Sequence, residues 1–166
     1  VPGLAFSVSA TTREPRAGEV DGRDYHFLSP DAFRARLAAG DFLEHEEVYP
    51  GRFYGTLRPE LDALAARVRA VVLDIDVKGA ASVKRIYGDR ARTVFVAPPS
   101  LDVLAARLRA RGTETEDKVA VRLARAEMEL AAAPTFDHVV VNDSLDRATA
   151  ELVALVTAWL GAPDGA

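Results

Sequence analysis

Three short apolar runs bounded by polar residues set the predicted architecture of this chain. They read AVVLDID at 70–76, TVFVA at 93–97 and HVVVN at 138–142. Continuous apolar runs of this length are typical of parallel strands that are buried on both faces. Segments with helical periodicity alternate with them, at 58–68, 79–87, 100–111, 115–131 and 145–160. This alternation predicts an α/β fold in which helices flank a parallel sheet.

The segment 10–57 interrupts the alternation with mixed strand and loop. We expect a strand at 4–9, a helix at 30–39 and a strand at 42–49, followed by a turn that leads back into extended chain. We interpret 10–57 as a lobe inserted into the core and 100–128 as a helical lid. The remaining segments then form the core of a single domain: 1–9, 58–99 and 129–166.

The composition narrows the classes of function. The net charge is −4, which argues against a broad surface for nucleic acid. The chain has no cysteine, which excludes disulfides and thiolate metal sites and favours the reducing cytoplasm. No apolar run approaches the length of a membrane span, so we expect no membrane association.

The loop after the first strand concentrates groups that bind phosphate. SVSATTREPRAGEVDGRDYHF at 7–27 contains Arg13 and Arg16, and Tyr25 can donate a further hydrogen bond. Two guanidinium groups can hold a phosphate through several charge-assisted hydrogen bonds. The carboxylate of Glu19 would repel that phosphate, so we expect it to orient an arginine. The alternative is a solvated polar loop with weak surface ion pairs.

Glu44, in FLEHEEVY at 42–49, is a candidate reader of guanine. Guanine presents its N1–H and N2–H donors side by side, and one carboxylate accepts both. Adenine presents an acceptor at N1, so the same carboxylate would discriminate against it. The hydroxyl of Thr56 can donate to guanine O6. The alternative is an ordinary glutamate on an exposed strand face.

Two further groups of charged residues suit phosphate transfer. Asp74 and Asp76 follow a predicted strand and resemble the acidic strand ends that hold Mg²⁺, although Asp76 can equally cap the next helix. The segment 100–128 is rich in arginine, which is expected of a lid that closes over phosphates. A generic charged hairpin remains the alternative. The arginines concerned are Arg107, Arg109, Arg111, Arg122 and Arg125.

Together these stretches resemble the guanylate kinase family along nearly the whole chain. The 7–27 stretch, FLEHEEVYPGRFYGT, VVLDIDVKGA, VFVAPPS, RLRARGTETE and VVVND occur in the family's order and spacing. The resemblance implies a fold like that of the P-loop kinases, and a nucleoside monophosphate kinase of purine nucleotide metabolism. Such an enzyme transfers the γ-phosphate of ATP to GMP, and we expect dGMP to serve as well. Mg²⁺ is the cofactor that the resemblance implies.

The resemblance also assigns roles to individual residues. It places the GMP site at Ser9, Arg13, Arg16, Glu19, Tyr25, Glu44, Tyr54, Thr56, Asp74 and Asp76. Arg111 and Arg122 match arginines over the ATP phosphates, and Asn142 matches a position near adenine or caps the last helix. Asp74 and Asp76 share the GMP and Mg²⁺ roles, with no division between them. The residues expected to act in catalysis are Arg13, Arg111, Arg122 and Asp76.

One expected motif is absent from residues 1–166. The phosphate-binding loop G-x-x-x-x-G-K-[ST] does not occur in them. We expect about 20 or more further residues upstream of Val1 that contain this motif, and we expect residues 1–166 alone to be inactive in catalysis. The alternative is a non-catalytic guanylate-kinase-like module that binds a partner protein. Such modules tend to lose GMP-site residues, whereas Arg13, Glu19 and Glu44 are present here.

Overall fold

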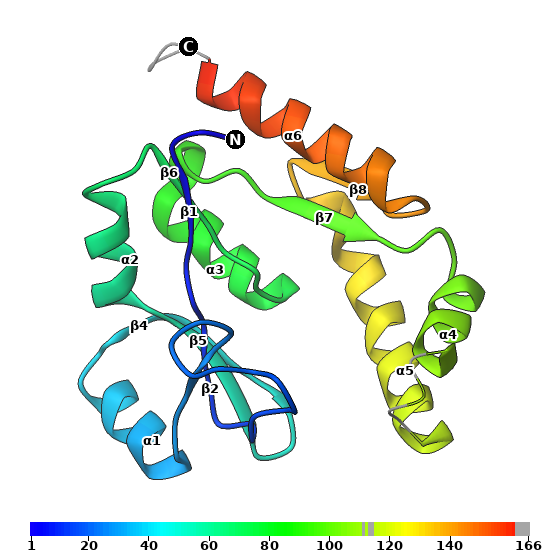
Figure 1. The fold of residues 1–166 in the computed structure, drawn as a ribbon, viewed down its shortest axis with the longest axis horizontal. Helices are drawn as coiled ribbons and strands as arrows, with labels where there is room; N and C mark the ends of the chain where they lie inside the picture. Colours follow the sequence, from blue (N-terminus) through cyan, green and yellow to red (C-terminus); the bar gives the residue numbers. More distant parts are fainter. Residues whose placement is uncertain (111, 113–114, 162–166) are drawn as a thin grey trace. The chain divides into compact units, whose positions relative to one another are not determined.

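The computed structural model describes residues 1–110, 112 and 115–161 of the chain. These residues form two compact units, one spanning Val1–Ala91 and the other beginning at Arg92. Figure 1 shows both units, with the first in blue to green and the second in green to red. Each unit combines helices with at least one pair of parallel strands, which confirms the predicted α/β class.

A four-stranded sheet dominates the first half of unit 1. Strands β4 (Phe42–Tyr49) and β5 (Arg52–Leu57) form an antiparallel hairpin. The short strand β2 (Ala10–Thr11) lies antiparallel to β5 and parallel to β3 (His26–Phe27). Helix α1 (Pro30–Ala38) begins at Ser29, whose Oγ accepts the Ala32 N–H, and it buries Phe33 against the sheet. The rings of Phe33 and Phe42 stack at a centroid distance of 4.3 Å, which anchors the helix.

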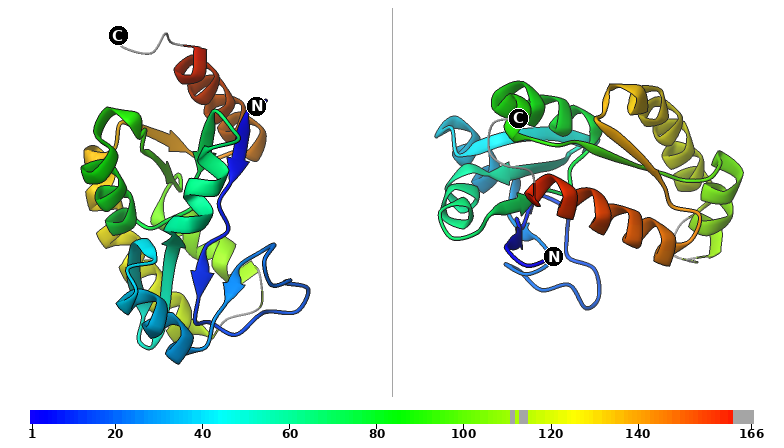
Figure 2. Two further views of the ribbon diagram at one scale, coloured as in Figure 1. Left: turned by 90° about the vertical axis from the view of Figure 1, so that its left-hand side faces the viewer. Right: turned by 90° about the horizontal axis from the view of Figure 1, so that it is seen from above.

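A second, parallel pair of strands completes unit 1. Strand β1 (Leu4–Phe6) pairs with β6 (Ala70–Val72), as the views of Figures 1 and 2 show. Helix α2 (Arg58–Ala65) follows β5 directly, and α3 (Val77–Tyr87) follows β6 and ends in the short helix η1 (Gly88–Arg90). Leu43 of β4 packs with Leu61 and Val83 in a buried cluster. This cluster joins the four-stranded sheet to α2 and α3.

Unit 2 contains another parallel pair and three long helices. Strands β7 (Val94–Ala97) and β8 (His138–Val141) are paired along their full length. Helices α4 (Leu101–Ala110) and α5 (Glu116–Ala132) pack against each other, and the short helix η2 (Ala133–Thr135) leads into β8. Helix α6 (Leu145–Gly161) ends the described chain and packs on β8. Within the described residues, no helix has both the length and the apolar character needed to cross a membrane.

Several local predictions require correction. The strand predicted over 70–76 ends at Val72, and the helix expected from 79 begins at Val77, because Asp76 caps it through the Gly79 N–H. The strand predicted over 4–9 ends at Phe6, and the next strand, β2, begins only at Ala10. The apolar runs are also less buried than predicted. The side chains of Val72, Val139 and Val141 are 39%, 44% and 46% exposed, because each parallel pair has only two strands in its unit.

Candidate nucleotide site

The carboxylate of Glu44 is buried on β4 and held by its neighbour strand. Its side chain is only 9% exposed, and the Thr56 hydroxyl on β5 donates to Glu44 Oε1 at 2.6 Å. The two residues are direct partners in the β4–β5 ladder. Burial raises the pKa of the Glu44 carboxyl, and the Thr56 hydrogen bond opposes this effect. A buried carboxylate whose hydrogen-bond donor is a neutral hydroxyl is a candidate for binding N–H donors.

An irregularity in β4 explains why Glu44 is buried. The pairing register shifts between Phe42 and Glu44, which is the signature of a β-bulge. Phe42 packs with Phe33 on one side, whereas Leu43 packs with Val83 of α3 and Glu44 lies against Gly79 of the same helix. Two successive side chains therefore reach α3, where a regular strand would direct only one of them to that face. The sequence shows this only as an imperfect alternation of apolar and polar residues.

Helix α3 approaches Glu44 through a glycine that the sequence analysis did not identify. A Cβ atom built on Gly79 would lie 2.7 Å from Glu44 Oε2. The Gly79 N–H donates to Asp76 Oδ1 at 2.8 Å, which fixes the first turn of α3. The negative charge of Asp76 also contributes to raising the pKa of Glu44. The structure thus brings the predicted residues Glu44, Thr56 and Asp76 together, and it places Gly79 against the Glu44 carboxylate.

Arg13 is fixed by a two-pronged ion pair with Glu19. The Arg13 Nη1 and Nη2 atoms donate to the two Glu19 oxygens at 2.9 Å each, and Nη1 also donates to the Glu14 carbonyl at 2.7 Å. Glu19 accepts a further hydrogen bond from the Arg16 backbone N–H at 2.6 Å. These bonds lower the pKa of Glu19 and raise the pKa of Arg13. The Arg13 side chain is 8% exposed, so the guanidinium is held in one orientation.

Aromatic rings surround the guanidinium group of Arg13. Its central carbon lies 5.2 Å from the ring centre of Tyr25 and 5.6 Å from that of Phe27. Tyr54 contacts Tyr25 edge to face at 6.1 Å and takes part in raising the pKa of Arg13. Burial raises the pKa of Tyr25, with a smaller contribution from the charge of Asp74. The sequence pattern pointed to Tyr25 and Tyr54 but not to Phe27.

The remaining predicted residues of unit 1 lie around this constellation. Ser9 is partly buried, and its carbonyl accepts the His26 N–H at 2.9 Å. Asp74 is exposed, and Asp76 is partly buried as the N-cap of α3. Among the described residues, no group of three or more acidic or histidine side chains could by itself hold a metal ion. Two carboxylates alone do suit Mg²⁺, which keeps several waters and completes its shell with substrate phosphates.

The arginines predicted for the lid belong to unit 2. Arg111 lies outside the described residues, and Arg122 is a partly buried residue of α5. Arg109 makes an exposed ion pair with Glu116, and Arg125 pairs with Glu129 at 2.6 Å. Arg107 is different, because its Nη1 atom donates to the Asn142 carbonyl at 2.8 Å and thereby joins α4 to the end of β8. Asn142 is partly buried, and its own N–H donates to the Ala97 carbonyl.

Comparison with known proteins decides the family. A sequence model of the guanylate kinase family matches residues 3–159. The chain belongs to the guanylate kinase family. It is 56% identical to the guanylate kinase of Salinibacter ruber over 96% of this chain and 85% of that protein. It is 48% identical to the guanylate kinase of Bacteroides fragilis over 95% of this chain and 78% of that protein.

A solved structure supports the same family assignment. The crystal structure of guanylate kinase from Anaplasma phagocytophilum superposes with a TM-score of 0.82 at 29% identity. The match covers 96% of this chain and 78% of that chain. The resemblance drawn from the sequence motifs and the predicted fold class are therefore both confirmed.

Proposed function

We propose that residues 10–57 form the GMP-binding lobe of a guanylate kinase, the enzyme that transfers the γ-phosphate of ATP to GMP. Membership of the guanylate kinase family gives the reaction. The observation that carries the assignment of the site is the buried Glu44 carboxylate, which is held by Thr56 and walled by Gly79. The family and this geometry together identify GMP as the acceptor nucleotide.

Guanine recognition follows from the donors and acceptors of this pair. The Thr56 hydroxyl has one proton, which Glu44 accepts in the absence of nucleotide. The N1–H and N2–H donors of guanine would replace this donor at the carboxylate, and Thr56 would then donate to guanine O6. Adenine offers an acceptor at N1, which would leave the buried carboxylate opposed by a lone pair. Unmet polar groups of this kind give strong discrimination between bases.

The phosphate of GMP is proposed to bind beside Arg13. The bonds to Glu14 and Glu19 use three of the five guanidinium donors and fix the plane of the group. The remaining donors, on the other edge of the guanidinium group, would donate to the phosphate. Arg16, Tyr25 and Tyr54 would add further contacts. Because Glu19 holds Arg13 before the nucleotide arrives, little side-chain entropy is lost on binding.

Transfer of the phosphoryl group depends on the alignment of the two nucleotides and on the neutralisation of charge, and it needs no covalent intermediate. A phosphate oxygen of GMP attacks the γ-phosphorus of ATP in line, so the aligned geometry lowers the barrier. We assign the ATP phosphates to Arg111 and Arg122, and adenine to the neighbourhood of Asn142. Mg²⁺, held by ATP phosphates, water and a carboxylate of Asp74 or Asp76, would supply charge neutralisation. Use of dGMP and a cytoplasmic location complete the proposal.

Calorimetric titration of the chain with GMP, with AMP as the control ligand, tests this assignment. We expect GMP to bind and AMP not to bind, and we expect dGMP to bind with similar affinity. Glu44→Gln replaces one acceptor oxygen by a donor, and it should weaken GMP binding by about 30-fold or more. Glu47→Gln, on the same strand with its carboxylate on the Gly51 N–H, is the matched control. A folded chain that does not bind GMP would contradict the assignment and favour a protein-binding module.

A further inference from the structure

The backbone passes between the two sheets of unit 1 at only two places. The first crossing is 7–9, between β1 and β2, and the second is the junction of β5 with α2 at 57–58. Glu44, Thr56 and Arg13 lie on one side of these crossings, whereas Asp74 and Asp76 lie on the other. The orientation of the chain at the crossings therefore sets how the two halves of the proposed GMP site face each other.

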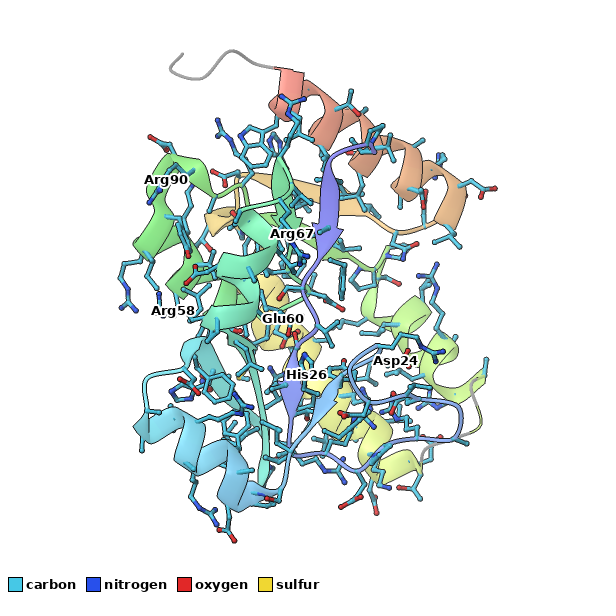
Figure 3. All side chains as sticks on the ribbon, turned by 60° about the vertical axis from the view of Figure 1, so that its left-hand side comes forward. Asp24, His26, Arg58, Glu60, Arg67 and Arg90 are labelled. Carbon is cyan, nitrogen blue, oxygen red and sulfur yellow. The ribbon has the colours of Figure 1, made fainter. Side chains whose placement is uncertain are left out.

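The Glu60 carboxylate connects the second crossing to the first crossing and to the four-stranded sheet. Glu60 stands in the first turn of α2, directly after the second crossing. Its Oε1 atom accepts the backbone N–H of Val8, in the first crossing, at 3.2 Å. Its Oε2 atom lies 2.5 Å from His26 Nε2 on β3. A carboxylate can only accept, so the imidazole donates through Nε2–H. Figure 3 shows His26 and Glu60 next to each other on their separate elements.

The contact is closed into a ring by the backbone. The His26 N–H donates to the Ser9 carbonyl at 2.9 Å, one residue after Val8. The side chains of His26 and Glu60 are 29% and 26% exposed, so they are partly shielded from water. Each of these hydrogen bonds is weaker than a fully buried one, because water can still reach the two side chains. Together, however, they hold two backbone segments at once.

A pocket lies beside this contact. Its volume is about 380 Å³, with His26 and Arg36 on the side of the four-stranded sheet and Pro59 and Glu60 on the side of α2. The apolar side chains of Phe27, Leu28 and Leu57 also line this pocket. The buried cluster of Leu43, Leu61 and Val83 also joins the sheet to α2 and α3, so the hydrogen bonds of Glu60 act on the side of the junction that the pocket leaves open.

We propose that Glu60 is a positioning residue that sets the orientation of the lobe 10–57 through its bonds to Val8 and His26. The inference rests on the proposed function, because it assigns Glu60 a role in assembling the GMP site. Glu60 does not touch GMP in this account. It reduces the range of lobe orientations, so that less conformational freedom is lost when GMP bridges Glu44 and Arg13 to the acidic strand end.

The test measures lobe orientation and GMP affinity separately. Because the chain has no cysteine, Ala35→Cys on α1 and Arg85→Cys on α3 give two unique, exposed sites for spin labels. Pulsed electron paramagnetic resonance then reports the distribution of distances between the lobe and α3. Calorimetry with GMP on the unlabelled chain gives the dissociation constant. Circular dichroism confirms that each variant is folded at the temperature used.

We expect Glu60→Ala to broaden the distance distribution and to weaken GMP binding by about three- to tenfold. Glu60→Gln retains an acceptor for the Val8 N–H and can donate from its amide nitrogen to His26 Nε2 once the imidazole proton moves to Nδ1, so it should stay within about twofold of the parent. His26→Leu removes only the bond to β3, and it serves as the second variant if Glu60→Ala does not fold. Asp62→Asn, on the exposed face of the same helix, is the control.

A role in stability alone would lower the unfolding temperature without broadening the distribution in the folded protein. An unchanged distribution and unchanged GMP affinity in folded Glu60→Ala, or in His26→Leu if the first variant does not fold, would overturn the inference. So would a Glu60→Gln variant as weak as Glu60→Ala. Failure of the parent chain to bind GMP would instead contradict the proposed function, and the distance distributions would still test the positioning role.

Discussion

Gly79→Ala is the substitution that most directly tests the packing of Glu44 against α3. The new Cβ atom would lie 2.7 Å from Glu44 Oε2, 3.2 Å from Glu44 Cδ and 3.3 Å from Ile75 Cβ. A separation below 3.0 Å requires one of the atoms to move. A glutamate end usually moves easily, but Glu44 is buried and its other oxygen is bound to Thr56 at 2.6 Å. We expect the carboxylate to be displaced from the Thr56 hydroxyl.

Two opposing contributions determine the stability of this variant. Alanine favours the helix by about 0.5–1 kcal/mol relative to glycine. Displacement of the carboxylate forfeits a hydrogen bond to a charged group, which contributes about 1.5–3 kcal/mol. The net loss in the free energy of unfolding is therefore about 0.5–2.5 kcal/mol. GMP affinity should fall by about 10- to 100-fold, since the displaced carboxylate no longer faces both guanine donors.

Urea unfolding and calorimetry with GMP measure the two effects on the same sample. Gly161→Ala is the matched control, because Gly161 ends a helix and a Cβ there meets nothing within 4 Å. In a Glu44→Ala background the clash partner is gone, so Gly79→Ala should become neutral or stabilising. If Gly79→Ala in the native background bound GMP within twofold of the parent, the proposed position of Glu44 in the site would be refuted.

Three further predictions follow from named contacts. Because burial raises the pKa of Glu44, the folded state keeps a proton that the unfolded chain has lost. The free energy of unfolding should therefore fall as the pH rises from the ordinary glutamate pKa through the raised pKa of the folded state. Urea unfolding of Glu44→Gln should lack this pH dependence. Arg13→Lys cannot keep both bonds to Glu19, so calorimetry should show GMP binding about 5- to 20-fold weaker, whereas equal affinity would contradict the clamp. Arg107→Ala removes the donor to the Asn142 carbonyl and should reduce the free energy of unfolding of unit 2 by about 1–2 kcal/mol, measured by hydrogen exchange, with unchanged GMP binding. Unaltered hydrogen exchange would contradict this role of Arg107.

The positions of the helices could be predicted from the sequence because a helix depends on local periodicity. Helix α1 was expected at 30–39 and lies at Pro30–Ala38, while α4 was expected at 100–111 and lies at Leu101–Ala110. Strand lengths were less accurate: apolar residues continue to Ile75, but pairing of β6 with β1 ends at Val72. Pairing depends on the partner strand, which no local pattern encodes.

The sequence selects the residues of the proposed site but does not give their geometry. Arg13, Glu19, Glu44 and Thr56 could be selected because their chemistry is specific. The bulge that buries Glu44 was not predictable, because a one-residue shift in register depends on long-range pairing. Gly79 gave no signal either, since a glycine early in a helix is identified as necessary only when the neighbour it faces is known.

The burial of Glu44 links the selectivity of the site to its stability. In the absence of nucleotide, this carboxylate has the Thr56 hydroxyl as a donor, and the nearby charge of Asp76 disfavours its ionised form. A buried carboxylate in such surroundings destabilises the fold, and a ligand that brings two adjacent N–H donors relieves that destabilisation. Guanine meets this requirement and adenine does not. In the proposed site, the same residue that lowers the stability of the free protein would thus make the bound state dependent on the correct base.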